Sequence, residues 1–162
     1  MVMLNTFAPP QADTKQQQYN VLLQQIRDIV YNEEDLVANL SNIAAILHQG
    51  MSFSWTGFYF AKEDELLLGP FQGPAAKTRI QKDEGVCGTA FTQECTVMVE
   101  DVEEYAGYIS LNDYDKSEIA IPAYQRGEVM LILNINSHHF HNFTEVDKRN
   151  LQQVMHLIEE VL

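Results

Sequence analysis

The chain has 162 residues, of which 46% are hydrophobic, and this length and composition suffice for one core and predict a single domain. Its 23 acidic residues outnumber the 10 basic ones, and the net charge of −13 argues against nucleic acid and anionic membrane surfaces as partners. No apolar run approaches the roughly 20 residues that cross a bilayer, and the N-terminus lacks a signal-peptide pattern, so we expect a cytoplasmic location.

The N-terminal half begins with a predicted flexible lead over residues 1–15, which contains Pro9 and Pro10, and residues 16–162 are expected to form one domain. Hydrophobic residues then recur at helical spacing in two stretches, 19–30 and 36–47, which predict two amphipathic helices. Asn32, followed by three acids, is expected to cap the second helix, and Gly50 is expected to end it.

The middle of the chain changes to short runs of aromatic and β-branched residues, which predict strands. The runs are SFSWTGFYFA, ELLLGP, TVMVE, SEIAIPAY and EVMLILNIN. Because the glycine-containing connection YQRGEV is short, Ile119–Tyr124 and Val129–Ile135 are expected to pair as an antiparallel hairpin.

The C-terminal end shows a capping-box pattern from Thr144 to Asp147, followed by an apolar helical face that ends at Val161. The order of elements is two helices, several strands with an embedded helical turn, and a last helix. It predicts an α+β fold, in which a central antiparallel sheet has the N- and C-terminal helices packed on one face.

The two cysteines raise a question of chemistry. Cys87 in GVCG lies at the expected start of a helix, where free N–H groups and the helix dipole lower a thiol pKa, or it is a small core residue between close-packed glycines. Cys95 follows the same helical turn, and the pair suggests neither a structural disulfide nor a zinc site. His138, His139 and His141 match no common ligand spacing, so neither a metal nor a cofactor is predicted.

The alternation of side chains along the predicted strands indicates a candidate ligand pocket. Trp55 and Tyr59 share one face of their strand, opposite Phe58 and Phe60, and are expected to form the apolar wall of a small-molecule pocket. Polar anchors are available at strand ends from three side chains: Glu118, Asn134 and Asn136. The two amides are also ordinary turn formers.

With these pieces in place, the chain resembles the free methionine-(R)-sulfoxide reductases, which are stand-alone GAF domains. The resemblance covers residues 19 to 162 and is carried by SWTGFYF, LLLGPFQG, RIQKDEGVCGTA, VEDVEEYAGYI, SEIAIP and ILNINS. It implies a GAF-like antiparallel sheet, with helices on one side and a ligand pocket under loops on the other. It also implies a cytoplasmic homodimer.

The resemblance further implies three pocket cysteines. One attacks the sulfoxide sulfur, becomes a sulfenic acid and is resolved as a disulfide that thioredoxin reduces. Here Lys77 stands at the first position, Cys87 at the second and Leu111 at the position of the nucleophile. Leucine cannot be a nucleophile, so the usual thiol cycle is incomplete.

Two pocket acids differ as well. Where the family reads Asp-Ile-Asp, this chain has Asn134-Ile135-Asn136, while the acid of SEI is kept as Glu118. An amide oxygen still accepts a hydrogen bond from an ammonium group, but it is no acid and carries no charge. The loss of these two acids is expected to shift ligand preference away from zwitterionic amino acids and toward less cationic molecules.

Together these features predict a catalytically degenerate GAF domain that acts as a small-molecule binding or sensing module. Its expected ligand-binding residues are Trp55, Tyr59, Cys87, Glu118, Asn134 and Asn136. Two alternatives stay open: an active reductase with Cys87 as catalytic residue, recycled by an external thiol or thioredoxin, and a structural dimerisation module. Whether the chain is an enzyme is therefore left undecided by the sequence.

Overall fold

Four α-helices and one 3₁₀-helix occur in the computed structural model, which describes residues 14–110 and 113–162. They are α1 (Lys15–Asn32), α2 (Leu36–Met51), α3 (Gly85–Gln93), η1 (Val102–Glu104) and α4 (Glu145–Glu159). Of the lead predicted for residues 1–15, the part up to residue 13 lies outside the described residues. Thr14 caps α1 and Lys15 begins it.

Six strands form one antiparallel sheet in the order β3-β2-β1-β6-β5-β4. They are β1 (Trp55–Lys62), β2 (Glu65–Gln72), β3 (Arg79–Gln81), β4 (Val97–Val99), β5 (Ser117–Gln125) and β6 (Glu128–Ser137). The predicted hairpin is confirmed, because β5 and β6 pair with Ile119 opposite Ile135. Arg126 and Gly127 connect them at φ 54° and 82°, the positive values that a two-residue hairpin turn requires.

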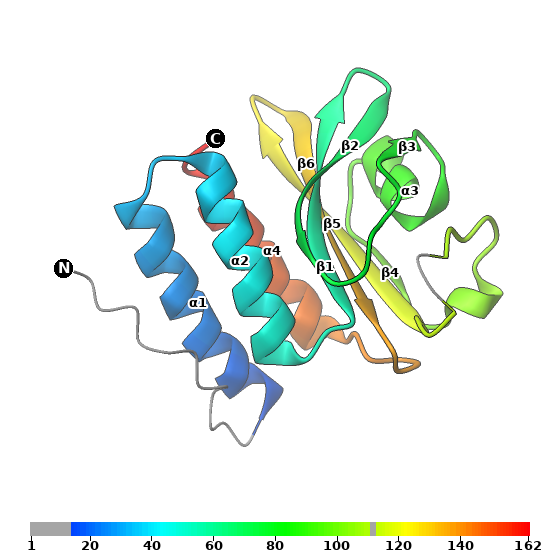
Figure 1. Ribbon diagram of the computed structural model, residues 1–162, viewed down its shortest axis with the longest axis horizontal. Helices are drawn as coiled ribbons and strands as arrows, with labels where there is room; N and C mark the ends of the chain where they lie inside the picture. The colour runs from blue at the N-terminus through cyan, green and yellow to red at the C-terminus, as the bar shows by residue number, and fades with distance from the viewer. Residues whose placement is uncertain (1–13, 111–112) are drawn as a thin grey trace.

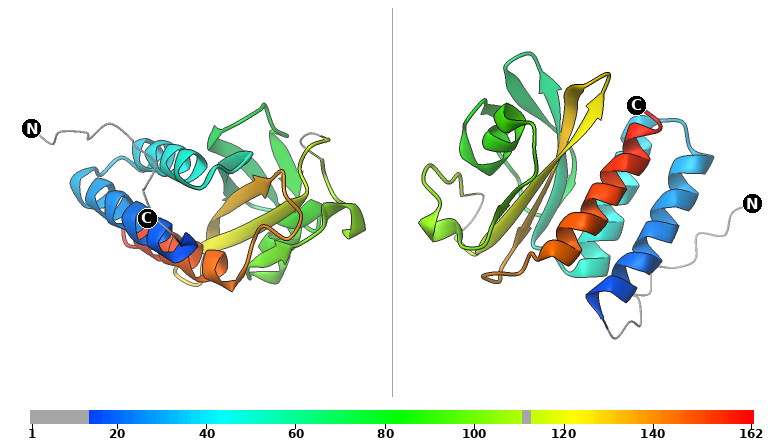
Figure 2. Two further views of the ribbon diagram at one scale, coloured as in Figure 1. Left: turned by 90° about the horizontal axis from the view of Figure 1, so that it is seen from below. Right: turned by 180° about the vertical axis from the view of Figure 1, so that it is seen from behind.

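The helices and the sheet stack in layers, as Figures 1 and 2 show. α2 and α4 cover one face of the sheet, while α1 packs on α2 and α4 and forms a layer further out. α3 and the loops around it cover the opposite face. The α+β prediction, with terminal helices on one side of an antiparallel sheet, is confirmed.

The predicted ends of the second helix are wrong in detail. Asn32 belongs to α1, where its Nδ2 donates to the Asp28 carbonyl at 2.6 Å, and the cap of α2 is Asp35, which accepts from Ala38 N at 2.8 Å. Gly50 lies inside α2, which ends at Met51 and is followed by the C-cap residue Ser52 in a left-handed conformation (φ 56°). A Cβ on Gly50 would lie 2.6 Å from Leu22 Cδ2, so this glycine serves the close packing of two helices.

The predicted start of the last helix is confirmed, since Thr144 and Asp147 form the capping box of α4. Asp147 also accepts hydrogen bonds from α1: Tyr19 Oη donates to it at 2.7 Å and Lys15 Nζ at 2.7 Å. This buried carboxylate therefore joins the first and last helices. Within the described ranges, no helix has the length and apolarity needed to span a membrane.

Candidate functional site

The sheet face opposite α2 and α4 carries the predicted pocket residues. Trp55 pairs with Asn136 between β1 and β6, and Asn136 pairs with Glu118 between β6 and β5, so these side chains share that face. Tyr59 and Asn134 lie on it by the same alternation. The predicted alternation along β1 is confirmed, because Trp55 and Tyr59 lie in one buried cluster while Phe58 and Phe60 pack in the other.

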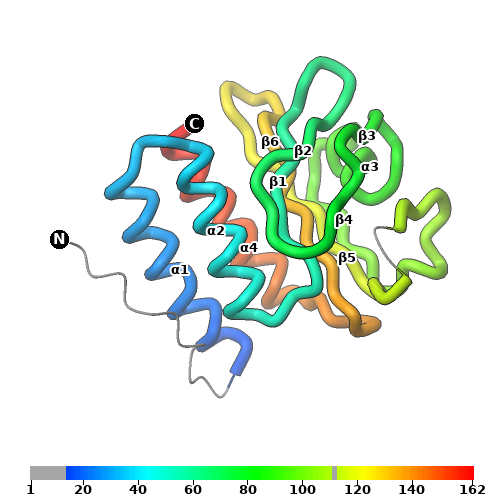
Figure 3. Tube along the Cα trace, viewed as in Figure 1, coloured from blue at the N-terminus to red at the C-terminus, as the bar shows by residue number. Residues whose placement is uncertain are grey.

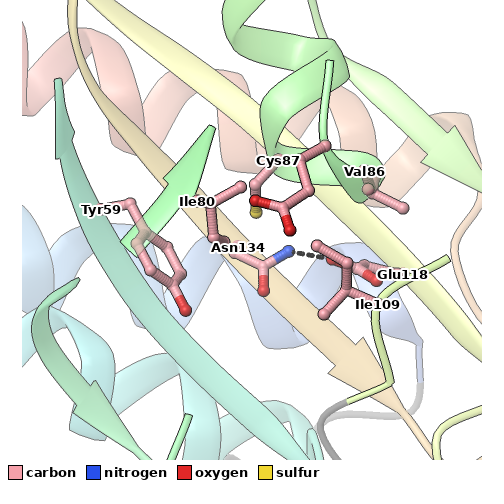
Figure 4. A pocket seen from close by; sticks show the side chains of 9 residues that line it. Tyr59, Ile80, Val86, Cys87, Ile109, Glu118 and Asn134 are labelled. Carbon is pink, nitrogen blue, oxygen red and sulfur yellow. Dashed lines mark hydrogen bonds between the residues drawn. The ribbon is translucent and has the colours of Figure 1, made fainter. Parts of the chain in front are cut away.

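A small cavity lies between this face and α3 (Figure 4). It is lined by Tyr59, Ile80, Glu84, Gly85, Val86, Cys87, Ile109, Glu118 and Asn134. Its volume of about 20 Å³ gives room for one water molecule. The structure thus brings four of the predicted site residues to one cavity, while Trp55 and Asn136 lie beside it without lining it.

Trp55 forms a fully buried wall behind the cavity. Its ring stacks on Phe71 at 5.4 Å and on Tyr59 at 6.1 Å, measured between ring centroids. Its Nε1 donates to the Pro74 carbonyl at 2.9 Å, and Tyr59 Oη donates to the Lys77 carbonyl at 2.9 Å. The β2–β3 loop, the green arch beside β1 in Figure 3, is therefore fixed to the site by two aromatic side chains.

The glycines around Cys87 bring α3 close to the sheet and its loops. Gly85 has φ 63°, which favours glycine, and a Cβ on Gly88 would lie 2.4 Å from the Gln81 carbonyl oxygen. Cys87 in the first turn of α3 is consequently only 3% exposed. Of the two interpretations of GVCG, the structure supports the buried core residue.

The electrostatics of Cys87 oppose a reactive thiolate. Burial, and then the negative charge of Glu118, raise the pKa of the Cys87 thiol well above its ordinary value. The helix start that would lower the pKa is outweighed by the loss of water. Cys87 is therefore a neutral thiol at physiological pH.

In the described part of the chain, no second cysteine lies close enough to Cys87 to form a disulfide with it. Cys95 is exposed beyond the end of α3, eight residues after Cys87, which corresponds to roughly 12 Å along a helix. A disulfide requires Cα atoms within about 7 Å. Lys77 lies at the surface, where its Nζ pairs with Glu84, and Leu111 lies outside the described residues.

Glu118 is a buried acid of the site with a strongly raised pKa. Burial raises its pKa from 4.5 to about 8, the charge of Asp115 adds to this, and hydrogen bonds from Asn134 and Tyr108 oppose it. Asn134 Nδ2 donates to Glu118 Oε1 at 2.5 Å, the contact drawn in Figure 4. At neutral pH a large share of Glu118 is a neutral carboxylic acid, which both donates and accepts hydrogen bonds.

Asp115 is a buried acid that sequence reasoning missed. Its carboxylate accepts from Ser54 Oγ at 2.7 Å and from Asn136 Nδ2 at 3.2 Å, and His138 Nε2 lies 4.0 Å away. The run YDK before β5 has the composition of an exposed turn, and nothing in its spacing indicates that the loop folds back onto the sheet.

The histidines lie apart from the cavity lining. His141 contacts Glu100 at 3.3 Å, and the Ser117 hydroxyl donates to the His139 carbonyl at 2.7 Å. Across residues 14–110 and 113–162, no group of three or more His, Cys, Asp or Glu side chains is arranged to hold a metal ion.

Comparison with known proteins identifies the class of fold and site. The family model of the GAF domain matches residues 31–162. GAF domain-containing protein A of Dictyostelium discoideum is 43% identical over 147 residues, which cover 90% of this chain and 93% of that protein. Free methionine-R-sulfoxide reductase of Escherichia coli is 36% identical over 135 residues, which cover 83% of this chain and 82% of the enzyme.

Solved structures agree with these relatives. Free methionine-R-sulfoxide reductase from Neisseria meningitidis, in complex with its substrate, superposes with a TM-score of 0.90 at 38% identity, covering 93% of this chain and 91% of that one. By its family model and its architecture, the molecule is a GAF domain. More narrowly, the chain belongs to the free methionine-R-sulfoxide reductase family of GAF domains.

Proposed function

We propose that the protein is a catalytically degenerate member of this family and serves as a small-molecule binding or sensing module. The observation that carries the proposal is the state of Cys87. It is the one cysteine among the described residues lining the cavity, and burial beside Glu118 keeps its thiol neutral. The attack of sulfur on a sulfoxide requires a thiolate, so this site is poorly suited to begin the reaction.

The side chains that remain are suited to binding. Tyr59 offers an aromatic surface, Asn134 an amide, and Glu118 a carboxyl group with a pKa of about 8 that donates or accepts. A cavity of about 20 Å³ cannot hold an amino-acid-sized molecule. A ligand of that size therefore requires the residues that line the cavity to move apart.

A second candidate, an active reductase, is favoured by the relatives that carry that name. In this scheme Cys87 sulfur attacks the sulfoxide sulfur and neutral Glu118 gives its proton to the oxygen. Methionine leaves and Cys87 becomes a sulfenic acid. Two equivalents of an external thiol then restore the cysteine, releasing water and a disulfide. The scheme requires a reactive Cys87 thiolate.

The deciding experiment incubates the purified protein with methionine-(R)-sulfoxide and excess dithiothreitol and quantifies methionine by chromatography. The Cys87→Ser and Cys95→Ser variants serve as a matched pair. We expect no methionine above the protein-free background from any of the three proteins. Methionine formed by the wild type and by Cys95→Ser, but not by Cys87→Ser, would establish the reductase and overturn the degenerate assignment.

A thiol measurement supports the same decision. Alkylation by iodoacetamide at neutral pH, followed by mass spectrometry, should label exposed Cys95 quickly and buried Cys87 slowly. In urea both should react at similar rates. Fast, ligand-blocked labelling of Cys87 in the folded protein would instead support the active enzyme.

A further inference from the structure

One side of the cavity reaches the surface. Of the nine described residues that line it, seven are buried, and the two that are partly exposed are Glu84 and Ile109. Ile109 packs on the backbone of Gly85, where a Cβ would lie 3.0 Å from Ile109 Cδ1. A molecule that enters from the solvent therefore meets Glu84 and Ile109 before it reaches Cys87.

Glu84 is held in position by partners outside α3. It is the N-cap residue of α3, but its side chain makes no capping hydrogen bond to the helix. Instead, one carboxylate oxygen pairs with Lys77 Nζ, and the other accepts from the Gln81 backbone N–H at 2.8 Å. The carboxylate is thus bonded to the β2–β3 loop and to β3.

Lys77 is joined in turn to the wall of the site. Its carbonyl accepts from Tyr59 Oη at 2.9 Å, and Tyr59 lines the cavity from β1. The contacts therefore run from β1 to the β2–β3 loop, and from that loop to the start of α3. While they are intact, α3 and the β2–β3 loop cannot separate at this side of the cavity.

The contact between Lys77 and Glu84 is one that can open. The Lys77 side chain is 42% exposed and the Glu84 side chain 32% exposed. Ion pairs at the surface hold their side chains together only weakly, and dissolved salt screens them. This connection is therefore reversible and sensitive to ionic strength.

We propose that the Lys77–Glu84 ion pair controls access to the cavity and must open before a ligand can enter. The proposal rests on the binding function proposed above and assigns the regulation of that site. Because the volume of about 20 Å³ is too small for an amino-acid-sized molecule, the lining has to separate. The ion pair crosses the partly exposed side, where separation admits solvent.

The test uses Cys87 to report the opening, because its thiol lines the cavity and is 3% exposed. Iodoacetamide is added to the full chain at neutral pH and low salt, and labelling is followed by mass spectrometry with exposed Cys95 as internal reference. We expect Cys87 of Lys77→Met to react roughly two- to fivefold faster than in the wild type, the range that one exposed ion pair allows. Loss of a positive charge alone disfavours a thiolate and would slow the reaction, so acceleration reports access.

Two further variants locate the effect. Lys77→Arg keeps the charge and should be labelled as slowly as the wild type. Arg79→Met removes another exposed ion pair, with Glu65, from outside the cavity lining and should also keep the wild-type rate. In molar sodium chloride, where charges are screened beyond about 3 Å, the wild type should approach the rate of Lys77→Met, and that variant should change little.

Equal Cys87 rates in the wild type and Lys77→Met would overturn the proposal. Equal acceleration by Arg79→Met would also overturn it, because the effect would then be a general loss of stability. The assay for methionine formation decides the proposed function separately. If the wild type forms methionine and Lys77→Met still accelerates labelling, the degenerate assignment fails while control by the ion pair stands.

Discussion

Burial of Glu118 ties the stability of the fold to pH at a single residue. Its folded-state pKa of about 8 lies above its ordinary value of 4.5, so between these pH values the folded state holds a proton that the unfolded state has released. The stabilising contribution is complete below about pH 4.5 and is lost as the pH rises through 8. Folding therefore becomes less favourable across this window.

The Glu118→Gln variant removes this dependence because glutamine does not ionise. We expect the wild type to lose stability with a slope of up to about 1.4 kcal/mol per pH unit between pH 5.5 and 8, and the variant to lose distinctly less. Urea unfolding at several pH values measures both slopes. Glu103→Gln, on an exposed acid, should behave as the wild type; parallel slopes for all three proteins would contradict the assignment.

Among single residues, those on regular elements were predictable and those on loops were not. Tyr59, Glu118 and Asn134 lie on strands, where alternation fixes the face of each side chain. Asp115 lies on a loop whose path depends on contacts distant in the sequence, including Ser54 and Asn136. Burial of Cys87 was one of two interpretations of GVCG, and the choice between them depends on how closely α3 packs on the sheet.

At the level of elements, α3 depends on Gly88. A methyl group there would approach the Gln81 carbonyl oxygen to 2.4 Å, and the backbone cannot move aside without displacing the β3–α3 turn. We expect Gly88→Ala to cost about 2–3 kcal/mol in urea unfolding. Gly127 has φ 82° and open space around it, so Gly127→Ala serves as a control that introduces backbone strain without a steric clash. We expect it to lower the free energy of unfolding by about 1 kcal/mol. Equal losses would show that α3 tolerates a side chain at this contact.

The hydrogen bonds between α1 and Asp147 of α4, called the joint below, are a second contact between elements that can be tested. Asp147 is fully buried and accepts from Tyr19, Lys15 and the Thr144 backbone. Asp147→Ala leaves the Tyr19 hydroxyl buried without this acceptor and should cost about 3 kcal/mol in urea unfolding. Asp64→Ala, which removes an exposed partner of Lys82, should leave the unfolding midpoint unchanged. A comparable loss in both variants would argue against a structural role for the joint.

The elements also show why some boundaries were predictable. Long periodic helices and the β5–β6 hairpin carry strong patterns and were found from sequence. β3 has three residues, Arg79, Ile80 and Gln81, which are too few to show alternation, and it forms because β2 offers a pairing edge. Asn32 and Asp35 are both good capping residues, and the choice between them depends on where α1 ends.

For the whole molecule, composition and element order were sufficient to predict the α+β class and the antiparallel sheet. Which helix layer packs on which was harder to predict from the sequence. The apolar face of α1 indicates burial but not its partner, and α1 packs on α2 and α4. Hydrophobic periodicity reports which face of a helix is covered, whereas the covering element is determined by the three-dimensional arrangement.

The order of the strands has a consequence for synthesis. β6 lies at the centre of the sheet between β1 and β5, although β1 is the first strand of the described chain and β6 the last, so β1 lacks its second neighbour until β6 has formed. The Tyr19–Asp147 bond adds a similar requirement between α1 and α4. During synthesis, the sheet and the helix layer therefore cannot be completed until β6 and α4 have emerged from the ribosome, and the edge of β1 stays unpaired until then.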